Sequence, residues 1–204
     1  MLGLIVFVSI NGASYFKDVD YAPEEGDILF QSLPHSRLVD AIEGVTDSPY
    51  SHCGIVSERQ GRWVVYEALK DVRATPLPEF LSRGRKQGFA VYRLKPKFRK
   101  HIPDTIKHVR SLLGRPYDVR YRMDDQYIYC SELVFKGYQK ATGDELGKLV
   151  RLGDMNWRPY RSTIEFYENG PVPHDRKMIT PRDLAKARQL KLVQSHNLTI
   201  ANVK

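Results

Sequence analysis

The sequence predicts an α+β domain in which helices pack against an antiparallel sheet. Two runs rich in β-forming residues, 52–57 and 62–69, are separated by a short turn and indicate a β-hairpin. Two further segments, 103–113 and 130–141, carry apolar residues at helical spacing. A hairpin combined with separate amphipathic helices is typical of this fold class.

The elements on either side of the hairpin follow from periodicity and from prolines. Residues 35–45 are a predicted helix because apolar residues recur on one face. Residues 73–81 contain two prolines, which predict a loop that leads into a short helix. Residues 89–94 are a predicted strand that ends at Pro96.

The C-terminal half is predicted from its stop signals and caps. The helix at 103–113 is expected to end at Gly114 and Pro116. Residues 153–173 have few regular signals and many aromatic residues, which predicts a long loop that either covers packed side chains or walls a cleft. Residues 180–187 predict a short helix, because they open with an N-cap threonine and a proline at the first helical position.

Cys130 is placed at the first turn of the helix predicted for 130–141. A thiol in this position faces unpaired backbone N–H groups and the positive end of the helix dipole. Both favour the thiolate, which is the nucleophilic form of cysteine. Cys130 is therefore a candidate nucleophile, and the alternative is a small buried hydrophobic side chain.

Six histidines are candidates for the base that a cysteine nucleophile needs. His52 stands out because turn residues lead into the β-forming run that it begins, which holds its backbone in place. The alternative is a strand-end histidine whose hydrogen bonds are satisfied locally. The other five are interpreted as solvated or locally bonded side chains: His35, His101, His108, His174 and His196.

Glu67 is the candidate for the group that holds the second imidazole nitrogen. It interrupts an apolar stretch in the second strand of the hairpin, where a buried carboxylate needs a polar partner. Residues near the open ends of a hairpin face each other, which brings Glu67 near His52. The alternative is an exposed glutamate on an edge strand.

Four segments occur in an order and spacing that together are specific: 25–30, 50–56, 65–68 and 129–134. With the stretch 114–118, they resemble the permuted papain-like amidases, a circularly permuted branch of the NlpC-type cysteine hydrolases. The resemblance implies a permuted papain-like fold, an antiparallel sheet or barrel packed against helices, with the catalytic cysteine at a helix N-terminus. His52 precedes Cys130, which is the permuted order, and a triad is recognised by geometry whatever its chain order.

By resemblance, Cys130 is the nucleophile, His52 the base and Glu67 the orienting residue of a cysteine hydrolase. Such an enzyme cleaves an amide through a thioester, and the expected substrate is a cell-wall peptide or another small acylated amine. The candidates for substrate binding or for an oxyanion hole are Tyr50, Tyr117, Tyr129 and Ser131. Cys53 follows His52 in a strand and is expected to point away from the cleft.

Two other functions remain open. Permuted papain-like folds also serve lipid acyl hydrolases and acyltransferases. Apolar, open cleft walls would favour a lipid substrate, whereas a closed polar pocket would favour a peptide. The third interpretation is a non-catalytic ligand-binding module. The presence of all three candidate catalytic residues is evidence against it. A fold by itself does not decide between these functions.

Composition limits the partners and cofactors. The chain has 204 residues and a formal charge of +8, which suits an anionic cell-wall or membrane surface. The sequence shows no nucleic-acid-binding motif, no phosphate-binding glycine loop and no zinc-type cysteine spacing. We therefore expect a peptide or lipid amide or ester as substrate, with no cofactor, no metal and no specific nucleic acid.

Residues 1–14 are apolar up to Ile10 and are interpreted either as the core of a signal peptide or as a first strand. The segment lacks a basic start and a clear cleavage site, and it is shorter than the roughly 20 residues that span a bilayer. Because the family resemblance begins near Glu25, we favour an exported or periplasmic protein over a cytoplasmic one. Residues 15–204 are expected to form a single domain.

Overall fold

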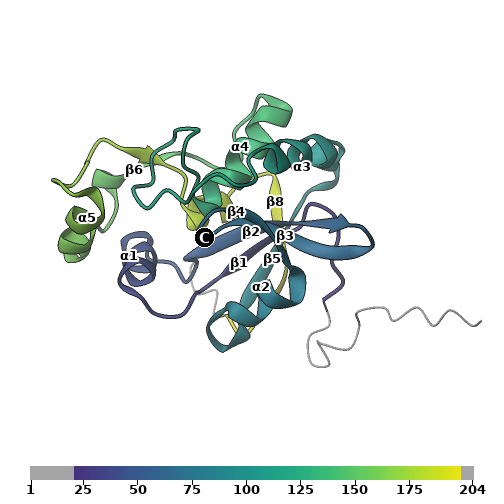
Figure 1. Cartoon of the computed structure of the whole chain (residues 1–204), viewed down its shortest axis with the longest axis horizontal. Coiled ribbons are helices and arrows are strands. Elements are labelled where there is room, and N and C mark those ends of the chain that lie inside the picture. The colour runs from purple at the N-terminus through teal and green to yellow at the C-terminus, as the bar shows by residue number, and fades with distance from the viewer. Residues whose placement is uncertain (1–20, 199–204) are drawn as a thin grey trace, which may run out of the picture.

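The computed structural model describes residues 21–198, whose core is an open six-stranded antiparallel sheet (Figure 1). The strands lie in the order β4-β3-β2-β1-β5-β8. They are β1 (Ile28–Gln31), β2 (His52–Arg59), β3 (Arg62–Ala68), β4 (Val72–Pro76), β5 (Phe89–Leu94) and β8 (Leu190–His196). Two short strands, β6 (Val150–Arg151) and β7 (Lys177–Met178), form a separate pair. The segment 1–14 lies outside the described residues.

Six α-helices and four 3₁₀ helices accompany the sheet in the described part of the chain. The α-helices are α1 (Arg37–Thr46), α2 (Leu77–Arg83), α3 (Ile102–Ser111), α4 (Cys130–Thr142), α5 (Arg161–Glu168) and α6 (Pro181–Ala185). The 3₁₀ helices are η1 (Arg85–Gln87), η2 (Pro96–His101), η3 (Leu152–Asp154) and η4 (Arg158–Tyr160). Within residues 21–198, no helix combines the length and the apolar character that crossing a membrane requires.

Helices cover both faces of the sheet, with α3 and α4 on one face and α2 on the other (Figure 1). Alternation along β2 directs Cys53 and Ile55 to the α4 face and Val56 to the α2 face. The neighbouring strand β3 directs Tyr66 to the α4 face and Val65 to the α2 face. Each face buries its own apolar cluster, so the sheet is the shared wall of two cores.

Close packing against α3 fixes the position of α4. A Cβ atom at Gly137 would lie 2.5 Å from Cγ2 of Val109 and 3.2 Å from the carbonyl oxygen of Thr105. Any larger residue at 137 would therefore push the two helices apart. The first turn of α4, which carries Cys130, is held in place by this contact and by the sheet.

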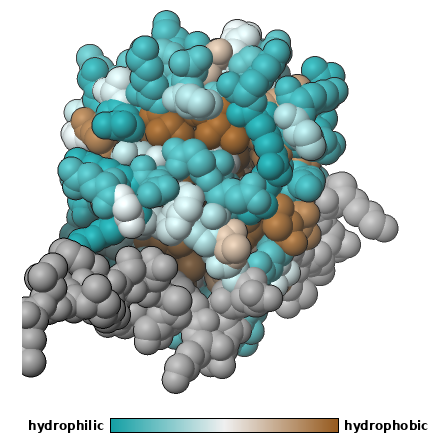
Figure 2. Space-filling model, turned by 90° about the vertical axis from the view of Figure 1, so that its right-hand side faces the viewer, coloured by the Kyte–Doolittle hydropathy of each residue, from teal (hydrophilic) through white to brown (hydrophobic). Residues whose placement is uncertain are grey.

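The surface of the molecule is mainly polar. The side that carries the β2–β3 turn is mostly hydrophilic, with hydrophobic residues visible in smaller areas (Figure 2). The exposed large apolar side chains of the described residues are Leu113, Val119, Tyr127, Phe166, Leu192 and Val193. Scattered exposure of this kind is normal for a globular domain.

The structure confirms the hairpin and the helices predicted at 103–113 and 130–141, but it also contains elements that the sequence patterns did not predict. The prediction of a loop from residue 73 is wrong, because β4 pairs with β3 there and Pro76 is the last residue of an edge strand. β8 lies in the polar tail and pairs with β5 at the other edge of the sheet. The stretch 153–173 contains α5 rather than only irregular chain.

Candidate active site

Cys130 is the first residue of α4 and is completely buried. The chain enters the helix through Tyr129, which is extended, and the first intrahelical hydrogen bond runs from the Leu133 N–H to the Tyr129 carbonyl at 3.0 Å. The N–H groups of the first turn therefore precede the regular hydrogen-bond ladder. Glu132 accepts a hydrogen bond from the Tyr129 N–H at 3.2 Å, which holds the entry to the helix.

His52 and Glu67 lie on the α2 face of the sheet and contact each other across the hairpin. The register pairs Gly54 with Glu67, so His52 is the diagonal neighbour of Glu67 on the same face. His52 Nε2 lies 2.5 Å from Glu67 Oε2, and both side chains are buried. The ring of Phe80 in α2 packs against the imidazole at a centroid distance of 5.6 Å. With Nε2 occupied, Nδ1 is the nitrogen left for Cys130.

Glu67 is held by more groups than the sequence analysis identified. Arg83, at the end of α2, donates from Nη1 and Nη2 to the two carboxylate oxygens at 2.8 Å each. Thr75 of β4 donates to Oε1 at 2.5 Å. The only sequence signal was that a buried carboxylate needs a partner, and nothing in the local pattern around residue 83 singled out that partner.

The charges of this cluster favour an ion pair between thiolate and imidazolium. Burial lowers the pKa of His52, but its interactions with Cys130 and Glu67 outweigh this effect and raise the pKa to about 9. Interaction with Cys53 lowers the pKa of Cys130 well below its usual range; burial opposes this shift, and His52 adds to it. Burial would raise the pKa of Glu67, yet its hydrogen bonds with His52, Arg83 and Thr75 lower it to about 2.

The expectation that Cys53 points away from the site is wrong. Alternation does place Cys53 on the opposite face of the sheet from His52, as predicted. That face, however, is the one on which α4 packs, so the Cys53 thiol and backbone N–H both interact with Cys130. The candidate base His52 and the candidate nucleophile Cys130 thus approach from opposite faces of the sheet near the beginning of β2.

The structure engages three of the four predicted substrate or oxyanion candidates in other contacts. The Tyr50 hydroxyl lies 3.2 Å from the Tyr92 hydroxyl, within an aromatic group on the α4 face. The Tyr129 hydroxyl donates to the Met123 sulfur at 3.0 Å and accepts from the Ile179 N–H at 3.1 Å. The Ser131 hydroxyl donates to the Ile179 carbonyl at 2.9 Å.

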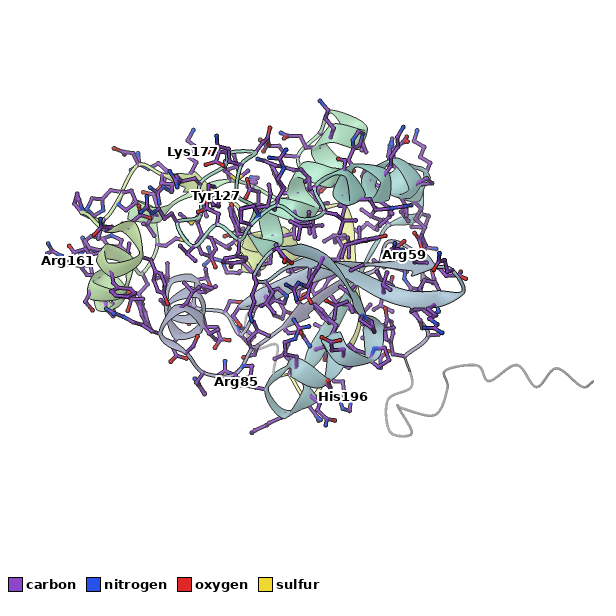
Figure 3. The ribbon with its side chains drawn as sticks, in the orientation of Figure 1. Arg59, Arg85, Tyr127, Arg161, Lys177 and His196 are labelled. Carbon is purple, nitrogen blue, oxygen red and sulfur yellow. The ribbon has the colours of Figure 1, made fainter. Side chains whose placement is uncertain are left out.

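Tyr117, the remaining candidate, packs against the core cluster that contains Cys130, together with Tyr121, which the sequence analysis missed. The hydroxyls of Tyr117 and Tyr121 are 3.0 Å apart. Burial raises the pKa of both hydroxyls well above its usual range, and the charge of Cys130 adds to the rise. The Tyr121 ring also packs on Tyr129 at a centroid distance of 4.6 Å. Both tyrosines belong to the segment between α3 and α4, as does Tyr127, which lies across the molecule from Arg85 (Figure 3).

An apolar cavity lies between α1, α5 and the segment that contains Tyr121. It holds about 80 Å³ of free space, which is room for a short apolar group and lies below the roughly 300–1,000 Å³ of typical small-molecule sites. Its lining includes Leu38, Ala41, Ile42, Val45, Tyr121, Leu152, Met155, Ile164, Met178 and Thr180. Met178 and Thr180 flank Ile179, whose backbone bonds Tyr129 and Ser131, so the wall of the cavity is tied to the first turn of α4 through one residue. We call it the α1–α5 cavity.

A buried thiol at the start of a helix, beside a His–Glu pair on an antiparallel sheet, defines the class of papain-like cysteine hydrolases. The chain order His52, Glu67, Cys130 is that of the permuted members. A family model described as the permuted papain-like amidase enzyme, YaeF/YiiX, C92 family, matches residues 22–194, and the chain belongs to this family.

Two relatives from Escherichia coli match most of the chain. The uncharacterized protein YiiX of strain K12 is 30% identical over 179 residues, which is 85% of this chain and 87% of that protein. A crystal structure described as metalloprotein yiiX from strain O157:H7 has a TM-score of 0.77 at 30% identity and covers 86% of this chain and 99% of its own. The fold is therefore shared along nearly the whole length of that protein.

The description of that crystal structure as a metalloprotein raises the question of a metal here. Within residues 21–198, no group of three or more His, Cys, Asp or Glu side chains is placed to hold a metal ion. In the site itself, both oxygens of Glu67 are occupied by hydrogen-bond donors. These residues do not fit a metal centre, and the chemistry proposed for the site uses protein groups alone.

Proposed function

We propose that this protein is a cysteine hydrolase that cleaves an amide bond, with Cys130 as nucleophile, His52 as general base and acid, and Glu67 as the orienting residue. The observation that carries the proposal is the buried contact of His52 Nε2 with Glu67 at 2.5 Å, beside a thiol at a helix start. Glu67 fixes the tautomer and the orientation of the ring, and its charge stabilises the imidazolium.

The mechanism begins from the thiolate–imidazolium pair, which the raised pKa of His52 and the lowered pKa of Cys130 favour at neutral pH. The Cys130 sulfur attacks the amide carbonyl and forms a C–S bond. His52 then gives its proton to the leaving nitrogen as the C–N bond breaks. A water molecule, deprotonated by His52, attacks the thioester and releases the acid and the thiolate.

The oxyanion of the tetrahedral intermediate needs donors on the first turn of α4. The Cys130 N–H comes before the first intrahelical hydrogen bond, so it is free of the helix ladder, and it lies at the positive end of the helix dipole. We assign the second donor to the Tyr117 hydroxyl, because the charge of Cys130 acts on its pKa and either group of its pair with Tyr121 can donate, which can leave the Tyr117 proton free. The Tyr129 hydroxyl donates to Met123, and Tyr50 is paired with Tyr92. Burial raises the pKa of Tyr117 well above its usual range, so the hydroxyl keeps its proton.

The α1–α5 cavity indicates an apolar group on the substrate. Its walls are mainly aliphatic and aromatic side chains, and Met178 and Thr180 in its wall flank Ile179, which is hydrogen-bonded to Ser131 beside Cys130. We therefore propose that the acyl part of the substrate occupies this cavity, which makes an N-acyl amine a better candidate than a polar cell-wall peptide. The same observation supports the second candidate function, an acyl hydrolase or acyltransferase acting on lipid esters.

A series of N-acyl nitroanilides, from acetyl to dodecanoyl, tests the proposal. Each methylene buried in the cavity contributes about 0.8 kcal/mol, so kcat/KM should rise up to about fourfold per methylene until the cavity is full. Cys130→Ala should show no turnover with any chain. Ile42→Trp, which fills part of the cavity, should slow only the long chains, with acetyl nitroanilide as its internal control.

The matched esters separate the two candidate functions. Cleavage of glycerophospholipid esters in preference to amides of the same acyl length would favour the lipid function. No turnover of any amide or ester by a protein whose Cys130 alkylates readily would contradict both and leave the binding-module interpretation.

A further inference from the structure

We propose that Cys53 and Cys130 form a reversible disulfide in the presence of a peroxide, and that this bond switches the hydrolase off. The inference rests on the proposed function in one respect: Cys130 must be the activated thiolate. Cys53 would then be a resolving cysteine, a modification site that the hydrolytic mechanism itself does not use.

The first observation is the pairing of the two cysteines in space. They are the only cysteines among 204 residues, and they are 77 positions apart. Both are free thiols and both are completely buried in the same core cluster. Cys53 projects from β2 onto the face where α4 packs, and Cys130 is the first residue of that helix. The pKa of each thiol responds to the other.

The second observation is the asymmetry of the two thiols. His52 and the neighbouring Cys53 lower the pKa of Cys130. Burial raises the pKa of Cys53 well above its usual range, and Cys130 and Glu67 add to the rise. A thiolate reacts with peroxide and a thiol does not, so oxidation begins at Cys130 alone. A low-pKa cysteine with a protonated neighbour in contact is the arrangement of a peroxide-sensitive pair.

The proposed chemistry balances in two steps. The Cys130 thiolate attacks one oxygen of the peroxide, the O–O bond breaks, and Cys130 becomes a sulfenic acid while an alkoxide or hydroxide leaves. The Cys53 sulfur then attacks the Cys130 sulfur; the S–O bond breaks, and water leaves with the proton of Cys53, which His52 relays. Two thiols lose two electrons to one peroxide, and a dithiol reductant reverses the reaction by exchange.

Burial gives the switch its selectivity. A peroxide is small enough to reach an interior that opens only locally, whereas a reductant such as dithiothreitol needs a wider opening and reverses the bond more slowly. The loss of the negative charge on Cys130 removes one of the interactions that raise the pKa of Cys53, so the second step is favoured once the first has occurred. Without Cys53, the sulfenic acid has no partner within the described residues and proceeds to sulfinic acid, which ordinary reductants do not reverse.

Intact mass and peptide mapping after hydrogen peroxide treatment test the inference on the full-length protein. The wild type should lose about 2 Da, and the peptide that contains Cys53 should be joined to the peptide that contains Cys130. Dithiothreitol should restore the original mass. Cys53→Ala should instead gain about 32 Da at Cys130, without recovery in dithiothreitol. Cys130→Ala should keep its mass, because Cys53 remains a protonated thiol. Cys53→Ser serves as a second variant if the alanine protein is unstable.

Iodoacetamide labelling of the reduced protein at neutral pH separates this inference from the proposed function. If Cys130 of the wild type labels fast with iodoacetamide, and a separate sample treated with peroxide forms a sulfinic acid, the disulfide is overturned and the nucleophile remains. A Cys130 that neither labels nor oxidises would overturn both. A disulfide found only between two molecules would also contradict the switch.

Discussion

His52 is the residue on which the chemistry of the site depends. Its Nε2 is bound to Glu67 at 2.5 Å, its ring packs on Phe80, and its other side faces Cys130. In a free histidine the proton is lost near pH 6.5. Here the interactions with Cys130 and Glu67 overcome the effect of burial and raise the pKa to about 9. The imidazolium therefore persists through neutral pH, opposite a thiolate.

This pKa predicts the alkaline limit of the proposed hydrolysis. Protonation of the leaving nitrogen requires the imidazolium, so kcat should fall about tenfold per pH unit above the His52 pKa of about 9. Alkylation of Cys130 by iodoacetamide needs only the thiolate and should not fall over the same range. The measurement is a pH profile of both rates on one preparation. A kcat that declines near pH 6.5 would mean that His52 is not held as described.

At the scale of the element, α4 combines the proposed nucleophile at its start with a buried acid in the same first turn. Glu132 caps the helix through the Tyr129 N–H at 3.2 Å, and Lys136 lies 2.8 Å from its other oxygen. Burial raises the pKa of Glu132 to about 8, although Lys136 opposes the shift. The helix is thus capped by a carboxyl group that is mostly protonated at neutral pH.

The raised pKa of Glu132 predicts a pH-dependent stability. The folded protein binds this proton up to about pH 8, while the unfolded chain releases it near pH 4.5. The contribution of Glu132 is therefore fully present below pH 4.5 and is lost as the pH rises toward 8, at about 1.4 kcal/mol per pH unit at most. Glu132→Gln keeps the cap acceptor and should flatten this part of the profile.

Urea unfolding of both proteins from pH 5 to pH 9 measures the effect, which appears in the difference between their free energies of unfolding. Glu145→Gln is the matched control, since Glu145 is exposed just beyond the same helix. Parallel profiles for the wild type and Glu132→Gln would show that Glu132 titrates as an ordinary carboxyl.

At the scale of the whole molecule, the site is assembled from both layers and is closed. His52 and Glu67 belong to the α2 face, Cys130 and Cys53 to the α4 face, and all four side chains are buried. The segment between α3 and α4 is closed on itself by the hydrogen bond from the Ile128 N–H to the Pro116 carbonyl at 2.9 Å. Its tyrosines 117 and 121 pack on the cluster that buries Cys130, so we expect access to the thiol to need local opening of this segment.

Removal of the Tyr121 ring should make Cys130 more accessible. Tyr121→Ala loses the contact with Tyr129 and the hydroxyl pair with Tyr117. We expect alkylation of Cys130 to become about tenfold faster at pH 8, the effect of lowering an opening free energy by about 1.4 kcal/mol. Tyr127→Ala, in the same segment but 41% exposed, is the control and should alkylate at the wild-type rate. An unchanged rate for Tyr121→Ala would mean that access runs elsewhere.

Local sequence patterns predicted the parts of the fold that depend on short-range physics. The hairpin, the helix that begins at Cys130 and the contact between Glu67 and His52 follow from periodicity, turn residues and strand register. β4 and β8 were not predicted, because an edge strand is stabilised by the neighbour it pairs with more than by its own residues. The error at Cys53 has the same origin, since alternation gives the face of a strand but not what packs on it.

The sequence by itself determined the chemical groups and their order: a cysteine at a helix start, a histidine that begins a strand, and a glutamate in the partner strand. These are set by interactions between residues that are near in the chain or directly paired. Only the tertiary structure decided the rest: the pairing of Arg83 with Glu67, the approach of Cys53 to Cys130, the tyrosines beside the thiol and the α1–α5 cavity. Each joins residues from different elements, and such contacts depend on how the layers pack.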